Sequence, residues 1–83
     1  MIETQVRRLM RDTLQIGERA DTFRADSPLL GAIPELDSMA VVTLITAVEE
    51  DFGLEFDDDE INAEIFETFG SLVGFISKKL DSA

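Results

Sequence analysis

The chain has 83 residues, a hydrophobic content of 45% and a formal net charge of −11. It contains no cysteine and no histidine, which excludes disulfides and thiolate metal sites and removes the commonest general base, so the composition argues against a self-contained catalyst. The acidic charge disfavours nucleic acids and anionic membrane surfaces as partners, and the length predicts one small domain over residues 1–83.

The charges are unevenly distributed along the chain. Between Arg24 and Lys78 there is no basic residue, whereas the stretch from Asp26 to Glu67 carries thirteen acids. Such a stretch keeps a small protein soluble, and it can also attract partners with basic patches. No apolar run approaches the roughly 18 residues of a membrane span, and the N-terminus lacks the layout of a signal peptide, so we expect a cytoplasmic protein.

Residues 2–16 predict the first helix. Apolar residues recur there at helical spacing, arginines occupy the other side, and Gly17 follows as a stop signal. The predicted apolar stripe consists of Ile2, Val6, Leu9, Met10, Thr13, Leu14 and Ile16.

Residues 17–36 form a long connection that holds both prolines of the chain. A loop of this length is unusual in so small a domain, but its clustered apolar residues predict that it lies over the core. Ser27-Pro28 is expected to open a brief helical turn, with proline at the first position. The predicted core residues of the connection are Leu29, Leu30, Ile33 and Leu36.

The second predicted helix follows Asp37, whose carboxylate can accept hydrogen bonds from N–H groups of the first turn. Gly53 is its expected end. Acidic residues in the last turn, Glu49, Glu50 and Asp51, oppose the helix dipole, which suggests that they serve another purpose. The predicted apolar stripe consists of Val41, Leu44, Ile45, Val48 and Phe52.

Residues 53–60 predict a loop, after which Asp59 or a neighbour is expected to cap a short helix that holds Ile61, Ile65 and Phe66. Thr68 is the expected cap of a last helix, and no alternating strand pattern of useful length occurs. The prediction is therefore an all-α fold, a bundle of three main helices plus one short helix. The stripe of the last helix consists of Phe69, Leu72, Val73, Ile76 and Leu80.

The acidic run from Asp57 to Glu60 raises the question of a calcium site. An EF-hand loop needs ligands at alternating positions, a glycine at the sixth and a glutamate at the twelfth. That pattern cannot be placed on these residues, so the run is interpreted as solvated charge and no metal site is predicted.

Ser38 stands one residue after the predicted cap and is therefore expected to be exposed at the first helical position. An anionic ester on its hydroxyl would lie against free backbone N–H groups at the positive end of the helix dipole. Asp-Ser before a helix is nevertheless a very common pattern, and the residues alone favour an ordinary helix start over a modification site.

Leu36-Asp37-Ser38-Met39, followed by an apolar helix that ends in Glu49-Glu50-Asp51-Phe52, resembles the acyl carrier proteins. These are small acidic four-helix proteins with a D-S-[LM] signature at the start of the second helix, and the resemblance covers almost the whole chain. It implies that Ser38 carries 4′-phosphopantetheine, transferred from coenzyme A by a phosphopantetheinyl transferase, and that the thiol of this arm holds acyl groups as thioesters. A cofactor thiol would explain how a chain without cysteine or histidine takes part in chemistry.

The resemblance also implies roles for neighbouring residues. Asp37 would cap the helix and contribute to recognition by the transferase. The expected partner-binding residues are Met39, Val42, Thr46, Glu49 and Glu50, although Met39 and Val42 could instead belong to the core. The implied partners are the transferase and acyl ligase, synthase or acyltransferase enzymes of fatty-acid, polyketide or related biosynthesis, and the protein is expected to be a monomer.

The sequence departs from the family pattern in two places. Glu35 stands where a glycine usually lies three residues before the serine, and Ala40 and Thr43 stand at positions that are often acidic in fatty-acid carriers. These departures favour a specialised carrier served by its own ligase or synthase. The string LLGAIPELDSMAV is similar to carriers associated with bacterial exosortase and exopolysaccharide clusters.

Two alternatives remain open from the sequence. The first is a discrete aminoacyl or peptidyl carrier loaded by an AMP-forming ligase, which the reduced acidity of the second helix permits. The second is a small helical interaction module without covalent cargo. A phosphopantetheinyl transferase would modify a carrier of either kind but not the interaction module.

Overall fold

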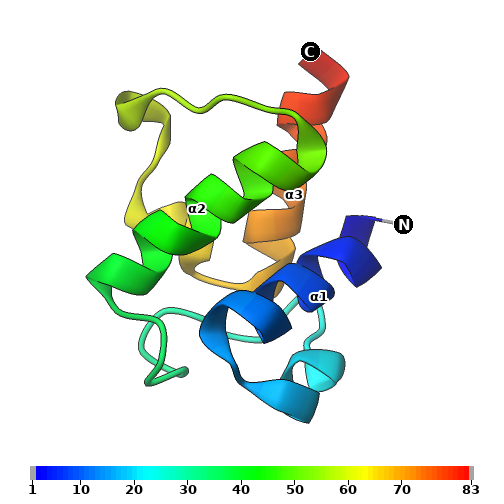
Figure 1. Cartoon of the computed structure of the whole chain (residues 1–83), viewed down its shortest axis with the longest axis vertical. Coiled ribbons are helices and arrows are strands. Elements are labelled where there is room, and N and C mark those ends of the chain that lie inside the picture. Colours follow the sequence, from blue (N-terminus) through cyan, green and yellow to red (C-terminus); the bar gives the residue numbers. More distant parts are fainter. Residues whose placement is uncertain (1, 83) are drawn as a thin grey trace.

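The computed structural model describes residues 2–82, where three α-helices are joined by loops and short 3-10 helices (Figure 1). The helix α1 contacts both α2 and α3. This arrangement confirms the predicted all-α bundle with a long connection between the first two main helices. In chain order the elements are α1 (Ile2–Leu14), η1 (Gly17–Thr22), α2 (Ser38–Phe52), η2 (Asp58–Glu60), η3 (Ala63–Phe66) and α3 (Phe69–Ser82).

The first helix ends at Leu14, two residues earlier than predicted. Gln15 has a φ of 56°, in the left-handed region that residues with a Cβ adopt at a cost. This conformation stops the helix and turns the chain into η1, which the sequence did not predict. Ile16 is nevertheless buried, so it contributes to the core from the loop rather than from the helix.

The long connection lies over the core, as predicted. Leu29, Ile33 and Leu36 are buried, whereas the prediction for Leu30 is wrong because its side chain is 44% exposed. The expected helical turn at Ser27-Pro28 is also wrong, since Pro28 forms an isolated antiparallel bridge with Thr68. Long-range backbone bonds hold this stretch extended: two N–H groups, those of Phe69 and Leu29, donate to the carbonyls of Ser27 and Glu67 at 2.8 and 3.1 Å.

Gly70 allows the connection to approach α3 closely. Its N–H donates to the carbonyl oxygen of Ala25 at 2.9 Å. A Cβ built on Gly70 would lie only 2.6 Å from that same oxygen. The absence of a side chain at this position therefore permits the backbone contact that fastens the connection to the first turn of α3.

The short third helix is present but differs in type and in its cap. It is the 3-10 helix η3, and its cap is Asn62, whose side-chain oxygen accepts from the N–H of Glu64 at 3.0 Å. The prediction that Asp59 or a neighbour caps a short helix holding Ile61 is therefore wrong, since Ile61 precedes η3. Ile65 and Phe66 are buried as expected.

The predicted cap of the last helix is confirmed. The hydroxyl oxygen of Thr68 accepts from the N–H of Ser71 at 3.0 Å, and the hydroxyl oxygen of Ser71 accepts from the N–H of Thr68 at 3.0 Å. This reciprocal pair satisfies donors that the start of a helix leaves without partners. It fixes where α3 begins and thus where its buried face points.

One apolar core joins the three helices and the loops. Among the residues whose burial the structure describes, no polar or charged side chain is buried. None of the helices within residues 2–82 has the length and apolar character needed to span a membrane. The fully buried larger side chains are Phe66, Phe69, Met10, Leu29, Leu44, Leu72, Ile76, Val6 and Val48.

Glu60 fastens the loop between α2 and η3 onto α3. Its carboxylate accepts from the N–H of Asp57 at 2.9 Å and from Lys79 Nζ at 2.7 and 2.8 Å. Phe56 and Phe75 pack beside this pair, with ring centroids 5.0 Å apart. The interpretation of the acidic run as solvated charge therefore does not hold for Glu60, which is half-buried and bonded.

The Glu60–Lys79 pair predicts a dependence of stability on pH. The Asp57 N–H, and then Lys79, hold the pKa of Glu60 below its ordinary value of 4.5. A lowered pKa contributes stability that is complete above 4.5 and is lost as pH falls through the folded-state value. We expect Glu60→Gln to be less stable than wild type at pH 7, and the difference to shrink in acid below the folded-state pKa.

Urea unfolding at pH 7 and at pH 3 measures this difference, with Glu64→Gln as the matched control because Glu64 is exposed. The control is expected to unfold like wild type at both values. An unchanged gap between Glu60→Gln and wild type at the two pH values would contradict the assignment.

Candidate functional site

The start of α2 is fixed by Asp37. Its backbone is extended, with φ −99° and ψ −174°, and its side-chain Oδ1 accepts from the N–H of Ala40 at 2.8 Å. Its carbonyl oxygen accepts from the N–H of Val41 at 2.9 Å, the first intrahelical bond. Asp37 is thus the N-cap that the sequence predicts, and the helix begins at the next residue.

Ser38 is exposed at the first position of α2, as predicted. The N–H groups of Ser38 and Met39 lie at the first two helical positions, where an α-helix supplies no backbone acceptor. A phosphoester on the Ser38 hydroxyl would meet these donors and the positive end of the helix dipole. The residues present therefore fit a phosphate-linked group, and the hydroxyl is accessible to a modifying enzyme.

Backbone hydrogen bonds and one ion pair hold the connection that leads to Ser38. Ile33 N–H donates to the carbonyl of Leu29, and Leu36 N–H donates to that of Ile33 at 3.0 Å. Glu35, the residue that replaces the family's usual glycine, forms an ion pair with Arg19 of η1. The pKa of Glu35 is lowered, first by a hydrogen bond from its own backbone N–H and then by Arg19. This pairing ties the approach to Ser38 onto the body of the protein.

The outer face of α2 is apolar next to Ser38. Met39 is 77% exposed and Val42 65% exposed, so the alternative that these two residues belong to the core is wrong. The hydroxyls of Thr43 and Thr46 donate to the carbonyls of Met39 and Val42, both at 3.0 Å. Because the hydroxyls are bonded to the helix itself, these exposed threonines add no strong charge or free donor to this side.

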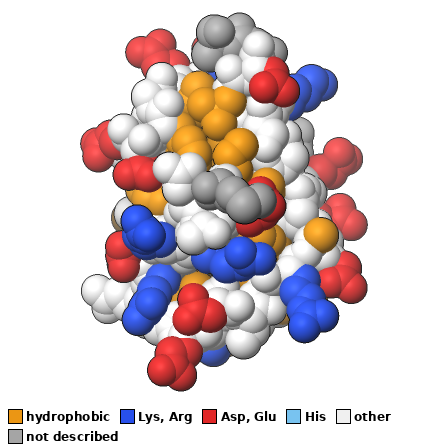
Figure 2. Space-filling model, turned by 90° about the vertical axis from the view of Figure 1, so that its right-hand side faces the viewer, with side chains coloured by type: hydrophobic (Ala, Val, Ile, Leu, Met, Phe, Trp, Pro, Cys, Tyr) orange, Lys and Arg blue, Asp and Glu red, His pale blue; other side chains and the backbone are white. Residues whose placement is uncertain are grey.

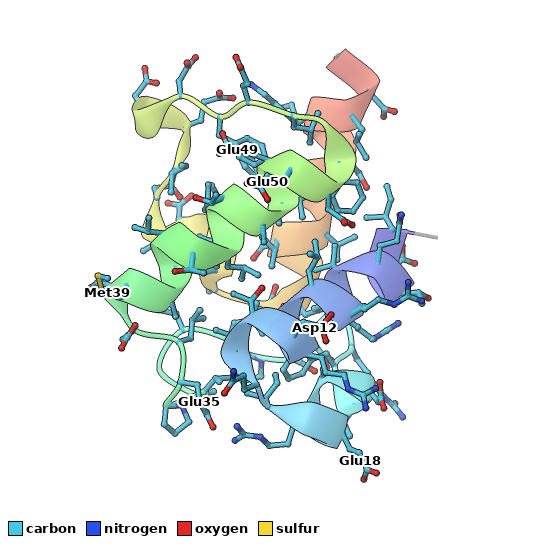
Figure 3. The ribbon with its side chains drawn as sticks, viewed as in Figure 1. Asp12, Glu18, Glu35, Met39, Glu49 and Glu50 are labelled. Carbon is cyan, nitrogen blue, oxygen red and sulfur yellow. The ribbon has the colours of Figure 1, made fainter. Side chains whose placement is uncertain are left out.

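The acids at the end of α2 lie away from this apolar face. Figure 3 shows Met39 at the beginning of the helix and Glu49 and Glu50 toward its other end. Glu49 is half-buried, and its Oε2 accepts from the N–H of Phe56 at 2.9 Å, which fixes the loop after Gly53. Glu50 is exposed. The unfavourable placement of Glu49 against the dipole is thus offset by a structural hydrogen bond.

Sequence reasoning missed the role of Arg7, which joins α1 to the connection and to α3. Arg7 donates from Nε and from one terminal guanidinium nitrogen to the carbonyl of Phe23, at 3.1 and 2.9 Å. Its guanidinium lies 5.1 Å from the ring centroid of Phe69. The amphipathic pattern placed Arg7 on the polar side of the first helix but could not show these long-range contacts.

Among the residues that the structure describes, no cluster of three or more potential ligands could hold a metal ion.

Comparison with known proteins identifies the family. Residues 4–76 match the family described as "Phosphopantetheine attachment site". The chain is also similar to a holo acyl carrier protein from Nitrosomonas europaea solved by solution NMR, with 56% sequence identity, a TM-score of 0.89, and coverage of 96% of this chain and 95% of that chain. The chain therefore belongs to the acyl carrier protein family, whose members bear covalently bound 4′-phosphopantetheine and are carriers rather than enzymes.

Proposed function

We propose that Ser38 is the attachment residue for 4′-phosphopantetheine and that the chain carries acyl groups as thioesters between biosynthetic enzymes. The exposed position of Ser38 at the tip of α2, in a chain of this family, supports the proposal. The bound group would supply the thiol, since the chain has no cysteine.

The roles of the chain's own residues follow from the geometry at the start of α2. Attachment replaces the hydroxyl proton of Ser38 by a bond from its oxygen to phosphorus, while the pyrophosphate linkage of coenzyme A breaks and the nucleotide leaves. The proton goes to a base of the transferase. Asp37 holds the helix start in place, and the N–H groups of Ser38 and Met39 would then donate to the phosphoester oxygens.

Partner enzymes are proposed to dock on the exposed apolar side of α2, formed by Met39, Val42 and Thr46. An uncharged surface of this kind supports recognition by shape and apolar contact, as expected for a carrier with dedicated acyl ligase, synthase or acyltransferase partners. Glu50 would provide charge at the far end, whereas Glu49 is engaged by Phe56. We propose that the carrier acts as a monomer in the cytoplasm, in fatty-acid, polyketide or related biosynthesis.

Modification by a broad-specificity phosphopantetheinyl transferase tests the attachment residue. The purified protein is incubated with the enzyme and coenzyme A, and its intact mass is measured. Wild type is expected to gain one phosphopantetheine and Ser38→Ala none. Ser77→Ala, which removes a half-buried hydroxyl from α3, is the matched control and is expected to gain the group like wild type.

An unmodified wild type, or a modified Ser38→Ala, would contradict the proposal. The cargo requires a second measurement, because the geometry of the site does not select one acyl group. Isolation of the holo protein from its native cell, followed by identification of the thioester, distinguishes an acyl cargo from an aminoacyl cargo.

A further inference from the structure

A second exposed surface lies on the side of the molecule opposite Met39. It combines arginines of α1 and the connection with a half-buried valine of α3, and we call it the arginine surface: Arg7, Arg8, Arg11, Arg24 and Val73. Figure 2 looks onto the right-hand side of Figure 1 and shows Lys and Arg side chains across the lower half of this face, below a strip of hydrophobic side chains. Figure 3 is viewed as Figure 1, and Met39 lies at its left edge, away from the side that Figure 2 shows.

Two adjoining hollows shape the arginine surface, and Arg7 lines both. One is a groove of about 470 Å³ between α1, the connection and α3, with Arg24 on one side and Phe69, Val73 and Gly74 along it. The other has a volume of about 330 Å³ and is lined by Arg8 and Arg11. Each hollow also contains one acid, Glu3 and Asp21 respectively, so four arginines face two carboxylates in a protein of net charge −11.

None of these four arginines forms a direct ion pair with a carboxylate in the described part of the protein. Arg7 is held by the Phe23 carbonyl and the Phe69 ring, and is therefore structural. Among the residues whose side chains the structure describes, the two ion pairs are Arg19–Glu35 and Lys79–Glu60. The guanidinium groups of Arg8, Arg11 and Arg24 have no carboxylate partner in that part of the chain, and all three residues are exposed.

We propose that the arginine surface binds an acidic amphipathic segment of a partner protein. Carboxylates of the segment would pair with Arg8, Arg11 and Arg24, and its apolar side chains would lie in the groove that Val73 and Gly74 line. The spread of charge over two hollows fits a segment of several residues better than a single small anion. A second copy of the chain is a poorer occupant, because two molecules of charge −11 repel each other.

This interaction goes beyond the carrier function and has a consequence for it. Since the arginine surface and the start of α2 lie on opposite sides, a partner on the arginine surface would leave Ser38 accessible (Figures 2 and 3). The carrier could then be held by one protein while a second protein acts on its cargo. The charge of the two surfaces differs, so they select different partners.

Titration of the ¹⁵N-labelled protein with a designed peptide tests the proposal. The probe is a 15-residue amphipathic helix with glutamate on one face and leucine on the other, and the matched peptide has lysine in place of glutamate. We expect the acidic peptide to shift amide signals of residues 3–11, 24–25 and 69–74. Arg8→Gln/Arg11→Gln/Arg24→Gln should weaken binding about tenfold, because each exposed charge pair contributes roughly a factor of two. Arg8→Lys/Arg11→Lys/Arg24→Lys should bind within about twofold of wild type.

Several outcomes would overturn the proposal. They are equal binding by the glutamine variant, shifts confined to α2, the same shifts with sodium sulfate at matched ionic strength, or concentration-dependent shifts of this face without peptide, which would indicate self-association. The glutamine variant is expected to accept phosphopantetheine at the wild-type rate. A modification rate reduced tenfold would show that the transferase uses this face and would contradict its separation from the carrier site.

Discussion

Replacing Gly70 by alanine is expected to lower the free energy of unfolding by about 2 kcal/mol or more, the cost of forcing an atom into a packed site. The new Cβ would lie 2.6 Å from the carbonyl oxygen of Ala25 and 3.1 Å from its carbonyl carbon and Cα. These are backbone atoms, so no side-chain rotation can relieve the contact. The connection must move away from α3, which weakens the bonds of the neighbouring Ser27–Thr68 region as well.

Gly74 provides the matched control, because it lies one helical turn later in α3 and a Cβ there would meet nothing within 4 Å. Gly74→Ala is expected to raise the free energy of unfolding by up to about 1 kcal/mol, the gain in helix propensity. Urea unfolding at pH 7 measures both variants. If Gly70→Ala were as stable as wild type while Gly74→Ala showed its gain, the close approach of the connection to α3 would be wrong.

The helices were predictable because their signals are local. Apolar spacing and the caps Asp37 and Thr68 depend on residues within one or two turns, and the structure confirms both caps. The error at Pro28 arises because a distant segment decides the outcome. Pro28 is extended because it pairs with Thr68, forty residues later, and no local pattern around Pro28 contains that information. Leu30 looked like a core residue by composition, but it lies in a turn and is 44% exposed.

The candidate site divides in the same way. The position of Ser38 followed from the cap and the signature, and its exposure follows from the first helical position. The role of Glu49 did not, although its acidic side chain at a negative helix end was a signal that something else holds it. That partner is the N–H of Phe56, which lies beyond the end of the helix. The contacts of Arg7 with Phe23 and Phe69 depend on the tertiary fold and gave no sequence signal.

Among variants that keep Ser38, the largest effect on function without an effect on folding is expected from Met39→Ala/Val42→Ala. Both side chains are mostly exposed, so their truncation should leave the midpoint of thermal unfolding within about 2 °C of wild type. A partner that covers these side chains gains up to about 1.5–3 kcal/mol of binding free energy for each one that it buries completely. We expect kcat/KM for phosphopantetheine transfer to fall about tenfold or more, which corresponds to about 1.4 kcal/mol of lost contact.

Leu30→Ala separates this effect from a general loss of exposed apolar surface. Leu30 is a large hydrophobic residue with 44% exposure that lies outside α2, and its truncation is expected to leave kcat/KM within about twofold of wild type. If Leu30→Ala lowered kcat/KM as much as the double variant, the transferase would not recognise the outer face of α2 specifically. An unchanged kcat/KM for the double variant would contradict the prediction. It would mean that the transferase modifies Ser38 without contacting the side chains of Met39 and Val42, and that other residues of the carrier are recognised.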